Sequence, residues 1–161
     1  MAVRERHRSL FGGAAVPVPL ESIAADLLGL HVEEVDGLEV SGLLLPLERT
    51  IRLNAGEARE SPGRRRFNLA HEIAHWVCHC PPTAPPAPIL CRPTLVGVAS
   101  GDPLEREANV FAAELLMPAE EVAAAVAAGA ALAVLAEDFG VSEVALAWRL
   151  YNLGLAADPP R

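Results

Sequence analysis

Residues 66–75 read RFNLAHEIAH, a stretch in which two histidines stand four residues apart among apolar residues. The apolar residues recur at helical spacing, which predicts a helix over residues 67–79. At 3.6 residues per turn, His71 and His75 project from the same helix face, and both imidazoles can reach a single metal ion. Glu72 points about 100° round the helix, so we expect it to act beside the metal rather than as a ligand.

The spacing His-Glu-x-x-His is typical of zinc peptidases. Neutral imidazoles and a carboxylate bind zinc, and the open fourth position takes a water molecule whose pKa falls to about 7. Glu72 is then placed to accept the proton of this water and to deliver it to the leaving amine. The sequence therefore predicts Zn²⁺ at His71 and His75, with Glu72 as the catalytic base, and Mn²⁺ could replace the zinc in vitro. The alternative is a helix that carries two incidental surface histidines.

A second helix should supply the third metal ligand. Asp102-Pro103 is typical of a helix start, with aspartate as the cap and proline at the first helical position, and we predict a helix from there to Met117-Pro118. Glu105 and Asn109 share one face of this helix, whereas Glu107 points about 200° away from Glu105. We predict Glu105 as the third ligand and Asn109 as a hydrogen-bond partner of a ligand imidazole. Glu107 is the alternative ligand, and Glu105 could instead only complement the helix dipole.

The remaining sequence predicts an α+β domain that is mostly helical and carries a small three-stranded sheet. Turn residues separate three short runs of strand-forming residues, which we expect to pair antiparallel. Residues 55–66, which end in Arg64-Arg65-Arg66, predict a solvated polar loop, with contact to an acidic strip on a substrate as the alternative. The proline-rich residues 80–101 predict an irregular loop. The predicted strands lie within residues 31–35, 38–47 and 50–53, and the other predicted helices within 20–28, 119–128, 131–139 and 142–153.

The C-terminal third of the chain resembles a helix-turn-helix in outline over residues 131–153. Its second helix carries only Arg149 as a cation, so packing on the core or docking of a partner is favoured over DNA binding. The chain is predicted to divide into a flexible N-terminus at 1–16, a metallopeptidase core at 17–118, a C-terminal helical segment packed on the core at 119–156, and a tail at 157–161.

Composition limits the classes of function. The 161-residue chain is about one domain long and has a formal charge of −8, which disfavours binding to nucleic acids or anionic membranes. The longest uncharged stretch, residues 122–136, is too short to span a bilayer. The N-terminus lacks a secretory pattern, and the odd number of cysteines, 3, argues against a disulfide framework. We expect a cytoplasmic protein, with a monomer favoured.

Taken together, these segments resemble the ImmA/IrrE family of metallo-endopeptidases. The resemblance covers nearly the whole chain, roughly residues 17–156. Ala74 and Trp76 stand where glycine and an aliphatic residue are commoner, and neither change removes a chemical group. The matching stretches are 18–30, 40–44 with Ser41-Gly42, 66–75, 105–118 and 139–154.

This resemblance implies a zincin-like domain with His71, His75 and Glu105 as zinc ligands and Glu72 as the base. It also implies a protein substrate, a helix-turn-helix transcriptional repressor that is expected to be encoded nearby. Cleavage of such a repressor would switch on mobile-element or stress-response genes. The rival hypothesis is a zinc-bearing binding module that sequesters a repressor, or acts in a toxin–antitoxin pair, without catalysis.

Several other side chains carry weaker hypotheses. His79 continues the four-residue series but drifts by about 40° per step, and it could stabilise the oxyanion of the tetrahedral intermediate or only the helix C-terminus. Tyr151, the only tyrosine, could also stabilise this oxyanion, although packing is favoured. Cys78, Cys80 and Cys91 could suggest a second zinc site, but a single residue separates Cys78 from Cys80, where two to four residues are usual. Oxidation of Cys80 with Cys91 as a regulatory switch is a remote alternative.

Overall fold

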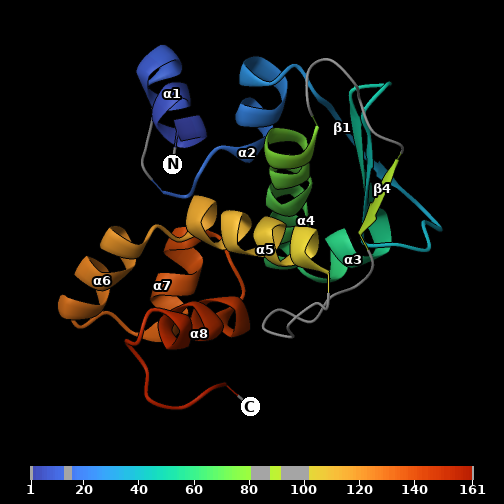
Figure 1. The fold of residues 1–161 in the computed structure, drawn as a ribbon. Helices are drawn as coiled ribbons and strands as arrows, with labels where there is room; N and C mark the ends of the chain where they lie inside the picture. The colour runs from blue at the N-terminus through green and yellow to red at the C-terminus, as the bar shows by residue number, and fades with distance from the viewer. Residues whose placement is uncertain (1, 13–15, 81–87, 92–101, 161) are drawn as a thin grey trace.

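The computed structural model describes residues 2–12, 16–80, 88–91 and 102–160 of the chain. Its elements are α1 (Ala2–Phe11), α2 (Leu20–Ser22), the π-helical η1 (Ile23–Leu27), β1 (His31–Val35), β2 (Gly42–Leu45), β3 (Thr50–Asn54), α3 (Ala55–Glu60), α4 (Pro62–Ala74), the π-helical η2 (His75–His79), β4 (Ile89–Cys91), α5 (Pro103–Leu116), α6 (Ala119–Ala127), α7 (Leu132–Phe139) and α8 (Glu143–Asn152). Figure 1 shows the sheet on one side of α4, with α5 passing across α4 and α6–α8 gathered away from the sheet. The predicted α+β class, mostly helical with a small sheet, is confirmed.

The sheet has the strand order β1-β3-β2-β4 and is mixed. β2 and β3 pair antiparallel, as the sequence predicted for neighbouring strands, but β1 and β3 pair parallel, with His31 opposite Thr50. The parallel pairing arises because the connection from β1 to β2 crosses the end of β3 and leaves β3 between them. Asn54 fixes this crossing: its backbone N–H donates to the Ser41 carbonyl at 3.1 Å and its side-chain amide donates to the Leu38 carbonyl at 2.6 Å.

A fourth strand, β4, lies inside the segment that was predicted to be wholly irregular. It pairs antiparallel with β2, with Cys91 opposite Gly42. A run of three apolar residues between prolines gives a weak strand signal, and pairing with β2 satisfies backbone groups that would otherwise lie at a sheet edge. The rest of the predicted loop, residues 81–87 and 92–101, lies outside the described residues.

Helix α4 begins earlier than predicted, and α3 precedes it, so residues 55–66 are largely helical rather than a loop. Single side chains cap both helices. The Asn54 side chain accepts a hydrogen bond from the backbone N–H of Glu57 at 3.1 Å, and the Ser61 hydroxyl accepts one from Arg64 at 3.3 Å. Pro62 follows Ser61 at the start of α4, where a missing N–H has no cost.

The triple arginine therefore lies on a helix, and two of its members join elements. Arg65 pairs with Glu21 of α2 and with Glu34 of β1, both at 2.6 Å. Arg66 donates to the carbonyl of Val18 at 2.7 Å and to that of Gly140 at 3.0 Å. These contacts hold α4 against three distant parts of the chain. They give Arg65 and Arg66 a structural role, in place of the predicted solvated loop.

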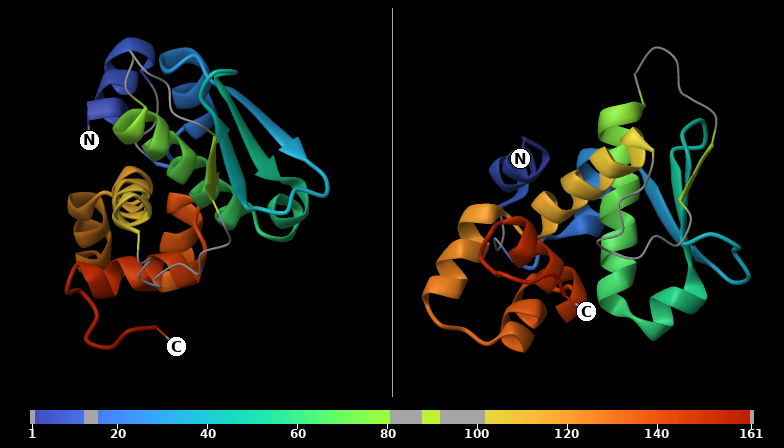
Figure 2. Two further views of the ribbon diagram at one scale, coloured as in Figure 1. Left: turned by 45° about the vertical axis from the view of Figure 1, so that its right-hand side comes forward. Right: turned by 60° about the horizontal axis from the view of Figure 1, so that its bottom comes forward.

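The hydrophobic core surrounds α4. Its fully buried residues come from α4, from the inner face of the sheet and from the helices on the other side; Figures 1 and 2 show these layers from three directions. Burial of this kind is the main favourable contribution to folding. The largest fully buried side chains include Leu20, Ile23, Leu44, Ile51, Leu69, Ile73, Leu115, Leu116 and Leu146.

The N-terminal segment, predicted to be flexible, contains helix α1. Arg4 and His7 on this helix are buried. The Arg4 guanidinium donates to both carboxylate oxygens of Glu121 on α6, at 2.7 and 2.8 Å, and His7 Nε2 lies 2.7 Å from the Ser22 hydroxyl. The ion pair between Arg4 and Glu121 joins this helix to a residue more than one hundred positions away in the sequence.

The C-terminal helices α6, α7 and α8 match the three predicted there. Gly140 has the left-handed φ of 64° that closes α7, and the Ser142 hydroxyl caps α8 by accepting from Ala145 N–H at 3.1 Å. Arg149 donates to the Met117 carbonyl at 2.9 Å and pairs with Glu114 of α5. The segment thus packs on the core through the arginine that would have contacted DNA. In the described part of the chain, every helix is too short or too polar to cross a membrane.

Candidate metal centre

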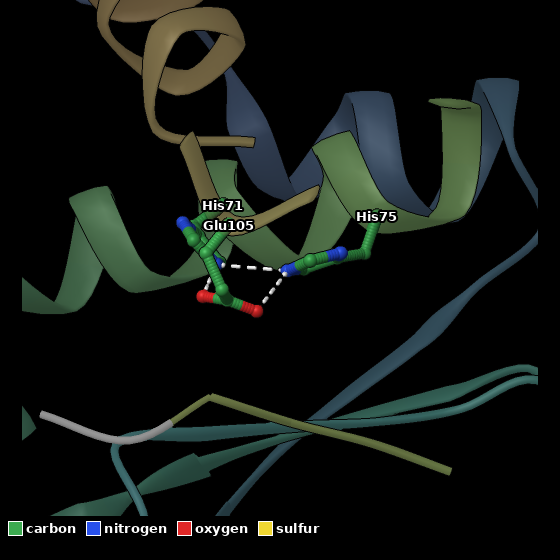
Figure 3. A group of neighbouring side chains, drawn as sticks. All are labelled: His71, His75 and Glu105. Carbon is green, nitrogen blue, oxygen red and sulfur yellow. Dashed lines mark hydrogen bonds and ion pairs between the residues drawn. The ribbon is translucent and has the colours of Figure 1, made fainter. Parts of the chain in front are cut away.

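Two helices bring together three side chains that can hold a metal ion. The His71 and His75 rings lie one turn apart on α4 and its continuation η2, and Glu105 approaches from the first turn of α5. His71 Nε2 is 3.2 Å from one Glu105 carboxylate oxygen, His75 Nε2 is 3.2 Å from the other, and the two Nε2 atoms are 2.9 Å apart. Figure 3 shows the three side chains turned toward one another on the side of α4 that faces the sheet.

The spacing of these atoms fits a tetrahedral ion. Two donors about 2.0–2.1 Å from one tetrahedral ion lie roughly 3.3 Å apart, which is close to the three separations in the structure. Among the described residues, His71, His75 and Glu105 are the one group of histidine, cysteine and acidic side chains close enough to share an ion. Two imidazole nitrogens and one carboxylate oxygen are donors that suit a divalent transition metal.

Electrostatics favour the ligand form of Glu105. Hydrogen bonds from His71 and then from His75 hold the pKa of this carboxyl well below its ordinary value, against the effect of partial burial. The two histidines are 5% and 1% exposed, so water screens these interactions little. The carboxylate is therefore ionised at neutral pH, the form that binds a cation.

Asn109 lies behind the first histidine. Its side-chain oxygen is 2.9 Å from His71 Nδ1. An amide oxygen only accepts, so Nδ1 carries a ring proton, which leaves Nε2 as the nitrogen that can bind a metal. Partners of this kind orient metal-binding imidazoles. The structure thus places Asn109, one helical turn after Glu105, where the sequence analysis expected it.

Glu72 is 0% exposed and lies next to His71 on α4. The space for its carboxylate comes from Gly42, the first residue of β2. A Cβ atom at residue 42 would stand 2.2 Å from Glu72 Oε1, so any side chain there would displace the carboxylate. From sequence, Gly42 was only part of a matching stretch, since nothing local shows that the strand meets the helix here.

A small hydrogen-bonded group holds β2 against α4 next to this contact. The Ser41 hydroxyl donates to one oxygen of Glu57 at 3.0 Å, and the Asn68 amide donates to the other at 3.3 Å. Glu57 on α3 thereby joins the residue before Gly42 to α4. This support was not predictable from sequence, because its three members lie on a loop and two different helices.

His79, Glu107 and Tyr151, the remaining candidates, differ in their contacts with the ligand group. His79 contacts His75, with 2.8 Å between the two Nδ1 atoms, and its Nε2 is 3.1 Å from Glu107; Glu107 itself is not part of the ligand group. Tyr151 is exposed on α8, where its ring contacts Trp148 in a T-shaped arrangement. Their roles in catalysis stay predictions.

The cysteines stand apart from the ligand group in the described part of the chain. Cys78 and Cys80 are free thiols, and burial raises the pKa of each. A raised pKa keeps a thiol protonated and slow to oxidise, which gives no support to a second zinc site or an oxidation switch. The side chain of Cys91 lies outside the described residues.

Comparisons with known proteins agree with this geometry. The sequence profile of the M78 peptidases, described as the IrrE N-terminal-like domain, matches residues 25–151. Among solved structures, a Mycobacterium tuberculosis transcriptional regulator superposes with a TM-score of 0.63 at 19% sequence identity, covering 93% of this chain and 45% of that one, so the chain spans less than half the length of that regulator. A comparison with curated protein sequences found no match. Because the profile covers most of the chain, the protein belongs to the ImmA/IrrE family, the M78 peptidases.

Proposed function

We propose that the protein is a zinc-dependent endopeptidase that hydrolyses a peptide bond in a partner transcriptional repressor of the helix-turn-helix type. The observation that carries the catalytic part is the convergence of His71, His75 and Glu105 beside the buried Glu72. This arrangement combines a donor set for one ion with a carboxylate that is not part of that set. A structural metal site would use a fourth protein ligand and would not need such a base.

His71, His75 and Glu105 would hold the zinc, and each is already oriented for it. Zinc, when bound, supplies a Lewis acid for the scissile carbonyl and makes a water molecule acidic enough to attack at neutral pH. Glu72 takes the proton from the attacking water and passes it to the nitrogen of the leaving amine. Gly42 leaves room for the Glu72 carboxylate, and burial keeps competing water away from it.

The substrate part of the proposal rests on the family resemblance. The superposed M. tuberculosis protein is named a transcriptional regulator, which supports a link between this fold and gene regulation without identifying a substrate. The formal charge of −8 and the internal contacts of Arg149 disfavour direct binding to DNA. A repressor protein is therefore a better partner than its operator, and we expect both proteins in the cytoplasm.

Incubation of the zinc-loaded chain with the helix-turn-helix repressor encoded nearby tests the substrate. We expect new fragments from one cleavage site, which mass spectrometry of the intact mixture would identify. The control is a peptide with the length and composition of the repressor segment that contains the cleavage site, but with a scrambled sequence. It should stay intact. A stable complex that forms without fragments would instead support the rival hypothesis, a binding module that sequesters the repressor.

A further inference from the structure

We propose that His79 and Glu107 form a hydrogen-bonded relay that fixes the His75 ring for metal binding, so that both are positioning residues of the metal centre. The inference rests on the proposed zinc site but not on cleavage of any substrate. It assigns a role to the third histidine of the series and to the acidic residue that was an alternative ligand.

The relay begins at the surface and ends at the ligand group. Glu107 on α5 is exposed, and its Oε2 lies 3.1 Å from Nε2 of His79. The His79 side chain is only 8% exposed, and its other nitrogen, Nδ1, lies 2.8 Å from Nδ1 of His75. Both nitrogens of the buried His79 ring therefore have a partner, as buried polar groups require.

The order of donors and acceptors along the relay follows from its outer end, where the Glu107 carboxylate lies. The Glu107 carboxylate only accepts, so Nε2 of His79 carries the hydrogen and Nδ1 of His79 is an acceptor. His75 must then donate from Nδ1, which leaves its Nε2, the nitrogen that faces Glu105, as the one that can bind a metal. The relay thus selects the ring tautomer that can bind a metal through Nε2.

His79 serves His75 in the way that Asn109 serves His71. In both cases an acceptor lies at Nδ1, at 2.8 Å for His79 and 2.9 Å for Asn109, while the two Nε2 atoms converge. An amide oxygen therefore orients His71, and an imidazole nitrogen orients His75. Asn109 and Glu107 both lie on α5, the helix that also carries Glu105, so one helix supplies a ligand and the outer end of both supports.

The four-residue spacing makes this contact geometrically available. In a regular α-helix, four residues advance about 400°, so His79 would be displaced by about 40° from His75. The two rings lie with centroids 5.0 Å apart, close to the 4.7 Å between the rings of His71 and His75.

The relay is tested by the zinc dissociation constants of variants, measured by competition with a chromogenic chelator. We expect His79→Leu, which cannot accept a hydrogen bond, to bind zinc roughly 10–100-fold more weakly than wild type. His79→Gln can accept from His75 and donate to Glu107, so it should restore most of the loss. Glu107→Gln should weaken zinc binding by about tenfold, the lower end of that range, because water can reach its exposed position.

Glu120→Gln is the matched control, since Glu120 is exposed on α6 and the change removes the same charge from the chain. Its zinc affinity should equal that of the wild type. Circular dichroism of each variant checks that it folds, and Glu107→Gln keeps the test decisive if His79→Leu does not fold, because residue 107 lies at the surface.

Nitrogen-15 NMR of the metal-free protein reads the relay directly, without any peptidase assay. We expect a proton on Nδ1 of His75 in wild type and a smaller population of this protonated form in His79→Leu. A wild-type His75 without a proton on Nδ1, or zinc binding by His79→Leu and Glu107→Gln as tight as wild type, would overturn the relay. If these variants weaken zinc binding as expected but the loaded wild type cleaves nothing, the endopeptidase proposal fails and the relay stands.

Discussion

Glu72 lies fully buried beside a ligand histidine, and its carboxylate has room because residue 42 is a glycine. The same dependence on single atoms recurs at the ligands, where the partner of each Nδ1 determines which nitrogen faces the metal. The chemistry of the centre thus depends on how the Glu72 carboxylate and the two histidine rings are oriented, and not only on which residues are present. Small displacements of one group should therefore reduce activity without removing the metal, since misplacement by about 1 Å can lower a rate by about 100-fold.

Gly42→Ala tests this dependence. The added methyl group would lie 2.2 Å from Glu72 Oε1, so we expect the carboxylate to be displaced and peptidase activity to fall by roughly 100-fold. Zinc content should stay at the wild-type level, because Gly42 holds no ligand. Gly56→Ala is the control, since its nearest atom is the Asn54 side-chain oxygen at 3.1 Å, which can adjust. Normal activity of Gly42→Ala would show that the contact with Glu72 is unimportant.

Among the elements, those with strong local signals were predictable from sequence. The helix of residues 67–79 followed from apolar spacing and the helix after Asp102 from its cap. The helices within residues 55–66 were not predicted, because each begins at a single capping side chain, Asn54 or Ser61, in a polar stretch. The parallel pairing of β1 with β3 was missed because strand order depends on contacts between distant residues. Neither the two capped helices nor the strand order can be predicted from a short window of sequence.

Arg65 gives a prediction at the scale of elements, because it joins α4 to α2 and β1. Replacing it with methionine should lower the free energy of unfolding by about 1 kcal/mol, a modest value because its partners Glu21 and Glu34 are partly exposed. Arg64→Met, a change at an exposed neighbour in the same helix, should have a smaller effect. Urea unfolding at neutral pH measures both.

The effect of Arg65→Met should also depend on pH. Burial alone would raise the pKa of Glu21, but the hydrogen bond and charge of Arg65 outweigh it and lower the pKa below 4.5. A lowered pKa in the folded state means that the stabilisation is present above the unfolded pKa and is lost as the pH falls through the folded pKa. The difference in stability between wild type and Arg65→Met should therefore shrink below about pH 4. A difference that grows on acidification would contradict the assigned pairing.

In the whole molecule, the metal centre joins the two longest helices, since its histidines lie on α4 and η2 and its carboxylate on α5. The three ligands and Asn109 were predictable because each pair lies within one helix at a fixed spacing. Gly42 and the relay through His79 and Glu107 were not predictable, since they depend on where β2 meets α4 and on where α5 meets η2. Sequence therefore located the candidate centre and its support Asn109, but not the other supports.

Zinc should stabilise the whole fold, because it binds the native arrangement of two helices. At a free zinc concentration 100 times the dissociation constant, the free energy of unfolding should rise by about 2.7 kcal/mol. His75→Ala should lose this increase, and His31→Ala, which changes an exposed histidine on β1, should keep it. Thermal unfolding with and without zinc measures the effect. An equal shift in all three proteins would indicate that zinc binds elsewhere.

The central claim is that Glu72 and the ligand group form a peptidase centre, and a comparison of wild type with Glu72→Gln tests it most directly. Both proteins would be loaded with zinc, checked for equal metal content, and incubated with the helix-turn-helix repressor before mass spectrometry. The account predicts one bound zinc in each protein, with repressor fragments from the wild type and none from Glu72→Gln. Fragments released by Glu72→Gln at the wild-type rate would contradict it.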